Sequence, residues 1–222
     1  MSQPRPAPVP APNRERILDA AERLLGRYGY RKMTVEDIAS EAGIGKGTVY
    51  LSFPSKEEVV LATVDRIVDA VCEEMARIGA SAAPPAARLR AMLLARVLVR
   101  FDRVSGYRES LNDLLSSIRG GLLERRERHF DREAELLGAI IRDGQRTAEI
   151  VAGNGTRLGR ALVLATNSFL PYSLSPGELG DRHRLERDVQ DVVGLLVGAL
   201  QAPQPRTTTT AGRPGASRGD TK

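Results

Sequence analysis

Hydrophobic residues recur at intervals of three and four over most of residues 14–201, which is the pattern of amphipathic α-helices. Alternation of apolar and polar residues, the pattern of a half-buried strand, is almost absent. In the first helix, Asn13 is placed to act as the N-cap and Gly29 to end the helix. Its apolar stripe consists of Ile17, Ala21, Leu24, Leu25 and Tyr28. The pattern predicts an all-α fold.

Two short helices separated by a tight turn are predicted next. Thr34 and Asp37 have the spacing of a capping box at the start of the first one. Gly43 then stands where a helix exit favours a left-handed residue. The second helix places Val49 and Phe53, four residues apart, on its inner face. A helix, a tight glycine turn and a short helix together predict a helix-turn-helix motif.

The outer face of the second helix carries the residues that would lie in a major groove. These residues are Lys46, Thr48, Tyr50, Leu51 and Ser52. Gly47 has no side chain, so the first turn can approach a neighbouring backbone closely, either that of DNA or that of the first helix. Glycine costs a helix about 1 kcal/mol relative to alanine, which is plausible where close approach matters.

The segment TVEDIASEAGIGKGTVYLSFPSKEEV, preceded by RERILDAAERLLGRYGY, resembles the DNA-binding domain of the TetR/AcrR family of transcriptional regulators. The family pattern is matched at Thr34, Ile38, Ala39, Ala42, Gly43, Gly47, Thr48, Tyr50, Phe53, Lys56 and Glu57. The residues that this resemblance places against phosphates are Thr34, Thr48, Tyr50 and Lys56. Those that it places against base edges or nearby sugars are Lys46, Gly47, Leu51 and Ser52.

Two positions depart from the family pattern. Gly45 stands where Ser is usual, which removes a side-chain cap, although Gly is an acceptable N-cap. Leu51 offers only apolar contact, for example with a thymine methyl group, so base readout would depend on Lys46 and on DNA shape. Taken singly, Tyr50 could be a packing residue and Lys46 a solvated one. The spacing of the whole set favours contact with the groove.

Composition and the resemblance divide the chain. Residues 1–13 and 202–222 are rich in Pro, Thr, Gly and Ala and are predicted to be disordered, either as solvated tails or as basic arms near DNA. A DNA-binding domain is expected over 14–58 and an effector-binding and dimerisation domain over 59–201. The segment 80–88 contains two prolines and is expected to join two helical regions.

The resemblance implies an effector pocket in the second domain. Aromatic and amide residues within otherwise apolar helices are the candidate lining residues: Phe101, Tyr107, Asn112, Asn167 and Tyr172. Few charges are expected to be buried, which favours a small, mainly hydrophobic effector. Arg96 and Arg100, one helical turn apart, either anchor an acidic group or pair with Asp and Glu.

The last helix carries apolar residues at spacings of four and three, namely Leu185, Val189, Val192, Leu196 and Leu200. In the family that the chain resembles, the last two helices of each subunit form a four-helix bundle across a two-fold axis. The stripe is therefore predicted to form the interface of a homodimer, with packing inside one subunit as the alternative.

Other classes of protein are disfavoured. His129 and His183 lack metal-ligand spacing, and Cys72 has no recognisable catalytic partner, so no metal, cofactor or enzymatic activity is expected. The formal net charge is +5, and the two terminal segments account for four of these charges. A nearly neutral middle argues against an architectural DNA-binding protein. Without a membrane-spanning or signal sequence, the chain is expected to be cytoplasmic.

The resulting hypothesis is a sequence-specific transcriptional regulator that acts as a homodimer on a palindromic operator. A ligand-responsive repressor is favoured over an activator, and effector binding in the C-terminal domain would release the DNA.

Overall fold

The computed structural model describes residues 11–174 and 178–203, and within these ranges the fold is all-α, as predicted. A single isolated bridge between Ile150 and Gln201 is the only β-type pairing among the described residues. The α-helices are α1 (Ala11–Lys32), α2 (Val35–Ala42), α3 (Lys46–Ser52), α4 (Lys56–Gly79), α5 (Pro85–Val104), α6 (Leu111–Arg146), α7 (Gly155–Ala165) and α8 (Arg182–Leu200). The 3₁₀ helices are η1 (Ser105–Ser110), η2 (Asn167–Phe169), η3 (Pro171–Ser173) and η4 (Glu178–Gly180).

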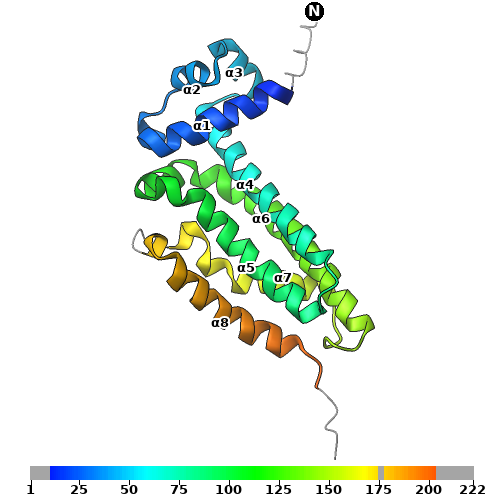
Figure 1. The fold of residues 1–222 in the computed structure, drawn as a ribbon. Coiled ribbons are helices and arrows are strands. Elements are labelled where there is room, and N and C mark those ends of the chain that lie inside the picture. Colours follow the sequence, from blue (N-terminus) through cyan, green and yellow to red (C-terminus); the bar gives the residue numbers. More distant parts are fainter. Residues whose placement is uncertain (1–10, 175–177, 204–222) are drawn as a thin grey trace, which may run out of the picture.

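The helices form a small head and a larger body (Figure 1). Helices α1, α2 and α3 make the head at one end, and α5, α6, α7 and α8 make the body. Helix α4 runs without a break from the head along the body. The boundary predicted between residues 58 and 59 therefore falls in the first turn of a continuous helix.

The observed start of the first helix differs from the predicted one. Helix α1 begins at Ala11, so Asn13 lies inside its first turn and is not the N-cap. Proline at position 12 is tolerated there because the first N–H groups of a helix have no intrahelical acceptor. Helix α7 ends at Ala165, where the Thr166 hydroxyl donates to the carbonyl of Leu162 at 2.9 Å and the chain tightens into η2. The rest of the predicted tails, 1–10 and 204–222, lies outside the described residues.

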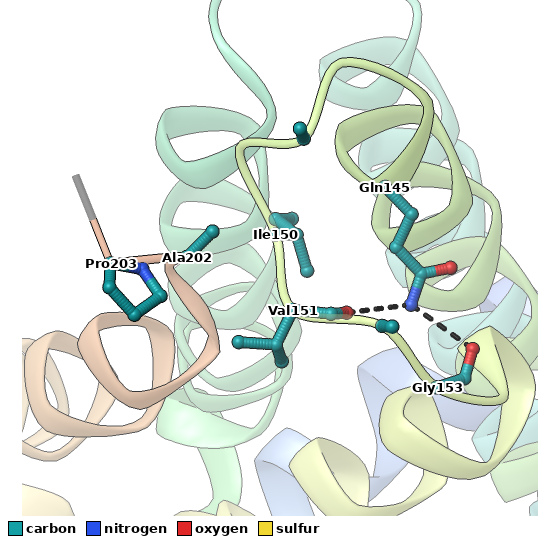
Figure 2. Close-up of a pocket in the computed structure, with 8 residues that line it drawn as sticks. Gln145, Ile150, Val151, Gly153, Ala202 and Pro203 are labelled. Atoms are coloured by element: carbon teal, nitrogen blue, oxygen red, sulfur yellow. Dashed lines mark hydrogen bonds between the residues drawn. The ribbon is translucent and has the colours of Figure 1, made fainter. Parts of the chain in front are cut away.

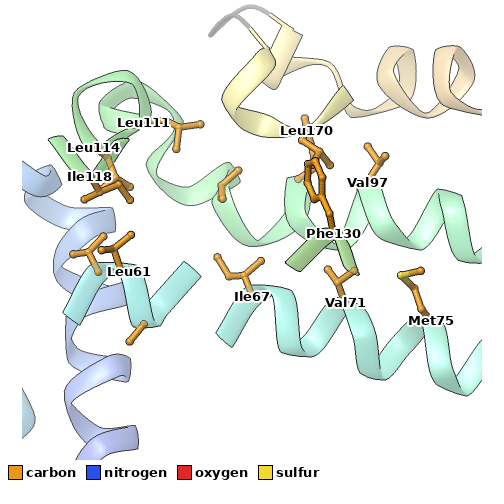
Figure 3. Packing of buried hydrophobic residues seen from close by; sticks show 14 of the residues in the cluster. Leu61, Ile67, Val71, Met75, Val97, Leu111, Leu114, Ile118, Phe130 and Leu170 are labelled. Atoms are coloured by element: carbon orange, nitrogen blue, oxygen red, sulfur yellow. The ribbon is translucent and has the colours of Figure 1, made fainter. Parts of the chain in front are cut away.

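The core is one hydrophobic cluster that extends from the head through the body. Figure 3 shows side chains of α4 and α6 that point toward one another, with Leu61 and Ile118 at the end near the head. Both side chains are fully buried, as are Val71 and Met75 further along α4. Because the same helix contributes to the core of the head and of the body, a movement of α4 is transmitted to both.

Candidate functional site

The turn between α2 and α3 is fixed by local sequence and by one distant side chain. The predicted capping box is present: the Thr34 hydroxyl accepts from the amide of Asp37 at 3.1 Å, and the Asp37 carboxylate accepts from the amide of Thr34 at 2.9 Å. Gly43 adopts the predicted left-handed conformation, with φ 64° and ψ 41°. Arg16 of α1 donates to the carbonyl of Ala42 at 2.6 Å and so holds the turn against the head. No local sequence pattern indicates that contact.

Helix α3 has the two faces that its sequence predicts. Val49 and Phe53 are 1% and 3% exposed and pack into the core of the head. On the outer face, Tyr50 and Leu51 are 47% and 62% exposed. A Cβ atom added to Gly47 would meet no protein atom within 4 Å, so this glycine does not serve close packing against α1. Approach by a molecule outside the chain remains as the reason for a glycine here.

Polar side chains on and near α3 already have partners. Lys46 forms an ion pair with Glu36 of α2 and lies 5.8 Å from the ring centroid of Tyr50. The hydrogen bond from Lys46 lowers the pKa of Glu36, and the same contact raises the pKa of Lys46. The Ser52 hydroxyl donates to the carbonyl of Thr48 at 3.2 Å. Contact between Lys46 and a base edge would therefore have to replace its pairing with Glu36.

Lys56 is placed differently from the residues of α3. Its ammonium donates to the carbonyls of Tyr30 and Met33, both at 3.0 Å, and lies 4.2 Å from the ring centroid of Tyr30. Burial lowers the pKa of Lys56. Two of its three donors are thus used to satisfy carbonyls where α1 ends, so the side chain stabilises the head, and its predicted phosphate contact stays a prediction.

The interior of the body holds a charged cluster that joins two arginines noted in the sequence with a glutamate that was not noted. Arg96 Nε donates to Glu133 Oε2 at 2.7 Å, and Arg100 donates to Glu133 Oε1. Arg96 and Glu133 are 0% exposed. Burial alone would raise the pKa of Glu133, but the two guanidinium groups outweigh it and the pKa is lowered. The two arginines therefore pair with a buried acid, and the expectation of few buried charges is wrong.

Glu133 was missed although the sequence carries a signal for it. It lies between Phe130 and Leu137 on the buried face of α6, where the helical period calls for an apolar residue. A glutamate on that face needs a buried cation.

The predicted lining residues do not form one group. Phe101 is buried in α5. Asn112 is exposed on α6, so it does not line an interior pocket of this structure. Asn167 accepts a hydrogen bond from the hydroxyl of Tyr172, which joins those two residues. The side chain of Tyr107 lies outside the described residues.

Two surface grooves lie elsewhere. Figure 2 shows the first, formed by the connection between α6 and α7 and by Ala202 and Pro203 after α8. There Gln145 of α6 donates to the carbonyls of Val151 and Gly153, so the helix satisfies two carbonyls of the loop. The second groove runs between α4 and α6 beside Cys72, whose thiol pKa is raised by burial. Neither groove is lined by the predicted effector residues.

The predicted dimer stripe is corrected in part. Leu185 and Val189 are 5% and 0% exposed because this face of α8 packs on α5 within the same subunit. Side chains that are already buried in this way offer no surface to a partner. Val192, Leu196 and Leu200 are half-buried. The most exposed apolar side chains of the last two helices are instead Leu195, at 76%, and Leu164, at 53%.

Two features are absent from the described ranges. None of their helices is long and apolar enough to cross a membrane. No group of three or more His, Cys, Asp or Glu side chains within them is arranged to hold a metal ion.

The head has the sequence of a known class of regulators. The family model for the bacterial regulatory proteins of the tetR family matches residues 17–63, which include all of α2 and α3. The head and the first turns of α4 are therefore similar to this family of bacterial regulators.

Relatives in sequence are bacterial regulators. The helix-turn-helix regulator YerO of Bacillus subtilis is 37% identical over 65 residues, which are 29% of this chain and only 22% of YerO. The fatty acid metabolism regulator protein of Bacillus subtilis is 25% identical over 158 residues, covering 70% of this chain and 79% of the relative.

Solved structures share the fold over most of the chain. A transcriptional regulator from Cytophaga hutchinsonii has a TM-score of 0.68 at 24% identity, covering 85% of this chain and 98% of that one. The triclosan complex of SmeT, the repressor of an efflux pump of Stenotrophomonas maltophilia, has a TM-score of 0.60 at 21% identity, covering 87% and 98%.

Proposed function

We propose that this chain is a ligand-responsive repressor of the TetR family that binds a palindromic operator as a homodimer and is released by an effector bound in its C-terminal domain. The observation that supports DNA contact by α3 is its outer face, where Tyr50, Leu51 and Gly47 are open to solvent on a helix whose inner face is fully packed. A short, rigidly held helix with an open first turn suits the major groove.

Within this proposal the DNA-contacting residues fall into groups according to the part of the DNA that each would contact. Lys46, Gly47 and Leu51 face base edges, and Tyr50 and Thr48 contact phosphates. Thr34, at the start of α2, and Lys56, at the start of α4, lie at helix N-termini, where the backbone also favours an anionic phosphate. The Ser52 hydroxyl donates its proton to the carbonyl of Thr48, so toward DNA it would act only as a hydrogen-bond acceptor.

The dimer would form through the outer faces of α7 and α8. Leu164 and Leu195 are large apolar side chains left exposed by the packing of a single subunit. A Cβ atom added to Gly194 or Gly198 would meet nothing within 4 Å, so the backbone of α8 is open to a close helix crossing. Four helices, two from each subunit, would cover these residues and set the distance between the two heads.

Coupling between effector and DNA would run through α4 and α6. Arg125 of α6 contacts Glu58 at 2.6 Å and Asp65 at 2.9 Å, both on α4. His129 of α6 also contacts Asp65, with its Nε2 atom 2.7 Å from Oδ1. A ligand that shifts α6 would carry α4 with it and change the spacing of the heads. An effector that prefers the shifted arrangement lowers DNA affinity, and DNA lowers effector affinity to the same extent.

The names of two relatives support a small-molecule effector. SmeT is found with triclosan, and the regulator from Bacillus subtilis is named for fatty acid metabolism. Within this proposal Asn167, Tyr172 and Phe101 are retained as lining residues. The chain's own effector would then be a small molecule with a large apolar part.

The first test is selection of bound duplexes from a random library at near-physiological salt, followed by sequencing. Enrichment of a palindrome with two half-sites is expected, and the selected duplex then serves as the probe for effector release. Binding that is titrated away by random DNA, with no enriched sequence, would contradict the proposal and favour an architectural DNA-binding protein.

A further inference from the structure

The buried cluster in the body has one positive charge more than it has negative charges. Arg96, Arg100 and Glu133 are 0%, 8% and 0% exposed. Both arginines pair with the same carboxylate, one oxygen each. Because arginine stays protonated in proteins, the cluster carries a net charge of +1 in a region without solvent. Burial of an uncompensated charge is unfavourable, so the cluster lacks an anion.

The free hydrogen-bond donor identifies where the anion belongs. Arg96 Nε donates to Glu133, and Arg96 Nη1 donates to the Thr166 hydroxyl at 3.0 Å. Arg96 Nη2 is buried and has no hydrogen-bond partner. Native proteins leave few buried donors without a hydrogen-bond partner. A charged guanidinium donor without a partner is especially unfavourable.

The surroundings of Arg96 are suited to an amphipathic molecule. The Phe130 ring centroid lies 5.7 Å from the Arg96 guanidinium carbon, and Phe130 belongs to the hydrophobic core. Tyr172 of η3 is 39% exposed, and the positive charges of Arg96 and Arg100 act to lower the pKa of its hydroxyl. Burial nevertheless raises the pKa of Tyr172 overall. The residue therefore reaches from the surface toward the cluster.

We propose that the effector carries a carboxylate, and that this carboxylate binds Arg96 Nη2 while its apolar body packs among the buried side chains of α5 and α6. One negative charge brings the cluster to neutrality, whereas a phosphate dianion would leave it negative. Tyr172 and its partner Asn167 lie in the 3₁₀ turns between α7 and α8, and displacement of these turns opens the way in. This assignment rests on the proposed function and changes the expected effector from mainly hydrophobic to amphipathic.

Calorimetric titration of the full chain tests the assignment. The probes are saturated monocarboxylates from butanoate to dodecanoate, each compared with the primary alcohol of equal chain length and used below its micellar concentration. The tightest-binding acid should exceed its alcohol by about 10-fold to 150-fold in affinity, the usual contribution of a hydrogen bond to a charged group. Arg96→Met should abolish this preference while leaving the alcohol affinity within about threefold.

The variants separate a binding role from a folding role. Arg96→Met leaves Arg100 paired with Glu133, so the remaining cluster is neutral and the fold is retained. Arg103→Met, on an exposed position of the same helix, is the matched control and should keep the acid preference. An acid preference that survives in Arg96→Met, or the absence of any acid preference in the unaltered protein, would overturn the assignment.

Operator binding measured on the same samples distinguishes the two proposals. If acids bind through Arg96 but leave operator affinity unchanged, the anion site stands and the ligand-responsive repressor fails. If a ligand releases the operator with equal effect on the unaltered protein and on Arg96→Met, the repressor stands and the anion site fails.

Discussion

Replacement of Glu133 by glutamine would remove the only negative charge of the buried cluster with almost no change in shape. Glu133 Oε2 accepts from Arg96 Nε at 2.7 Å, and Oε1 accepts from Arg100. After Glu133→Gln, the net buried charge rises from +1 to +2. The glutamine amide group also turns a donor toward one of the guanidinium groups, which has only donors to offer.

The magnitude follows from the burial of the three side chains. Breaking a buried ion pair by removal of one partner destabilises a protein by about 3–5 kcal/mol. For a chain of this length, 1 kcal/mol corresponds to about 2–4 °C in Tm, so a decrease of about 6–20 °C is expected. Arg96→Met, by contrast, leaves one cation paired with one anion, so it should lower Tm by much less than Glu133→Gln does.

The assay is thermal and urea denaturation followed by circular dichroism. All variants must be compared at one protein concentration, because association of subunits makes Tm depend on concentration. A decrease of less than about 1 kcal/mol in the free energy of unfolding of Glu133→Gln would refute this reasoning, since a buried cluster with a net charge of +2 should destabilise the fold by more than that. Equal destabilisation by Arg96→Met would show that the contacts of the cluster, and not its charge balance, stabilise the body.

Three further changes test other parts of the molecule. Tyr50→Ala should weaken operator binding by about 10-fold or more in an anisotropy titration, without a change in Tm, since the ring is exposed. Tyr28→Ala, on the exposed side of α1, is the control, and an equal loss of affinity in both variants would show that Tyr50 does not contact the operator. Leu195→Asp should yield monomers in sedimentation, whereas the control Leu123→Asp on α6 should not. A dimer that persists in Leu195→Asp would show that the outer face of α8 is not part of the interface. For Asp65, burial would raise the pKa, but His129 and Arg125 outweigh it and the pKa is lowered. Its contribution to stability is therefore complete above the ordinary pKa of about 4 and is lost as pH falls through the lowered value. In urea titrations, Asp65→Asn should lower the free energy of unfolding by about 1–3 kcal/mol at neutral pH and by almost nothing near pH 2. A decrease that does not depend on pH would show that the charge of Asp65 is not its cause.

Local features of the head were determined by the sequence. The capping box of Thr34 and Asp37, the left-handed Gly43 and the buried pair Val49 and Phe53 all depend on residues three or four positions apart. Such contacts form within one or two helical turns, so the order of residues specifies them directly. The all-α fold follows for the same reason.

The tertiary structure decided which residues meet across long distances in the chain. Arg96 and Glu133 are 37 positions apart, and Arg16 reaches the carbonyl of Ala42 from 26 positions away. The tertiary structure also decided that Leu185 faces its own subunit and Leu195 faces solvent, although both are leucines of one helix. A helical period shows that a face is apolar but not what covers it, because the covering surface comes from other helices whose packing is not encoded locally.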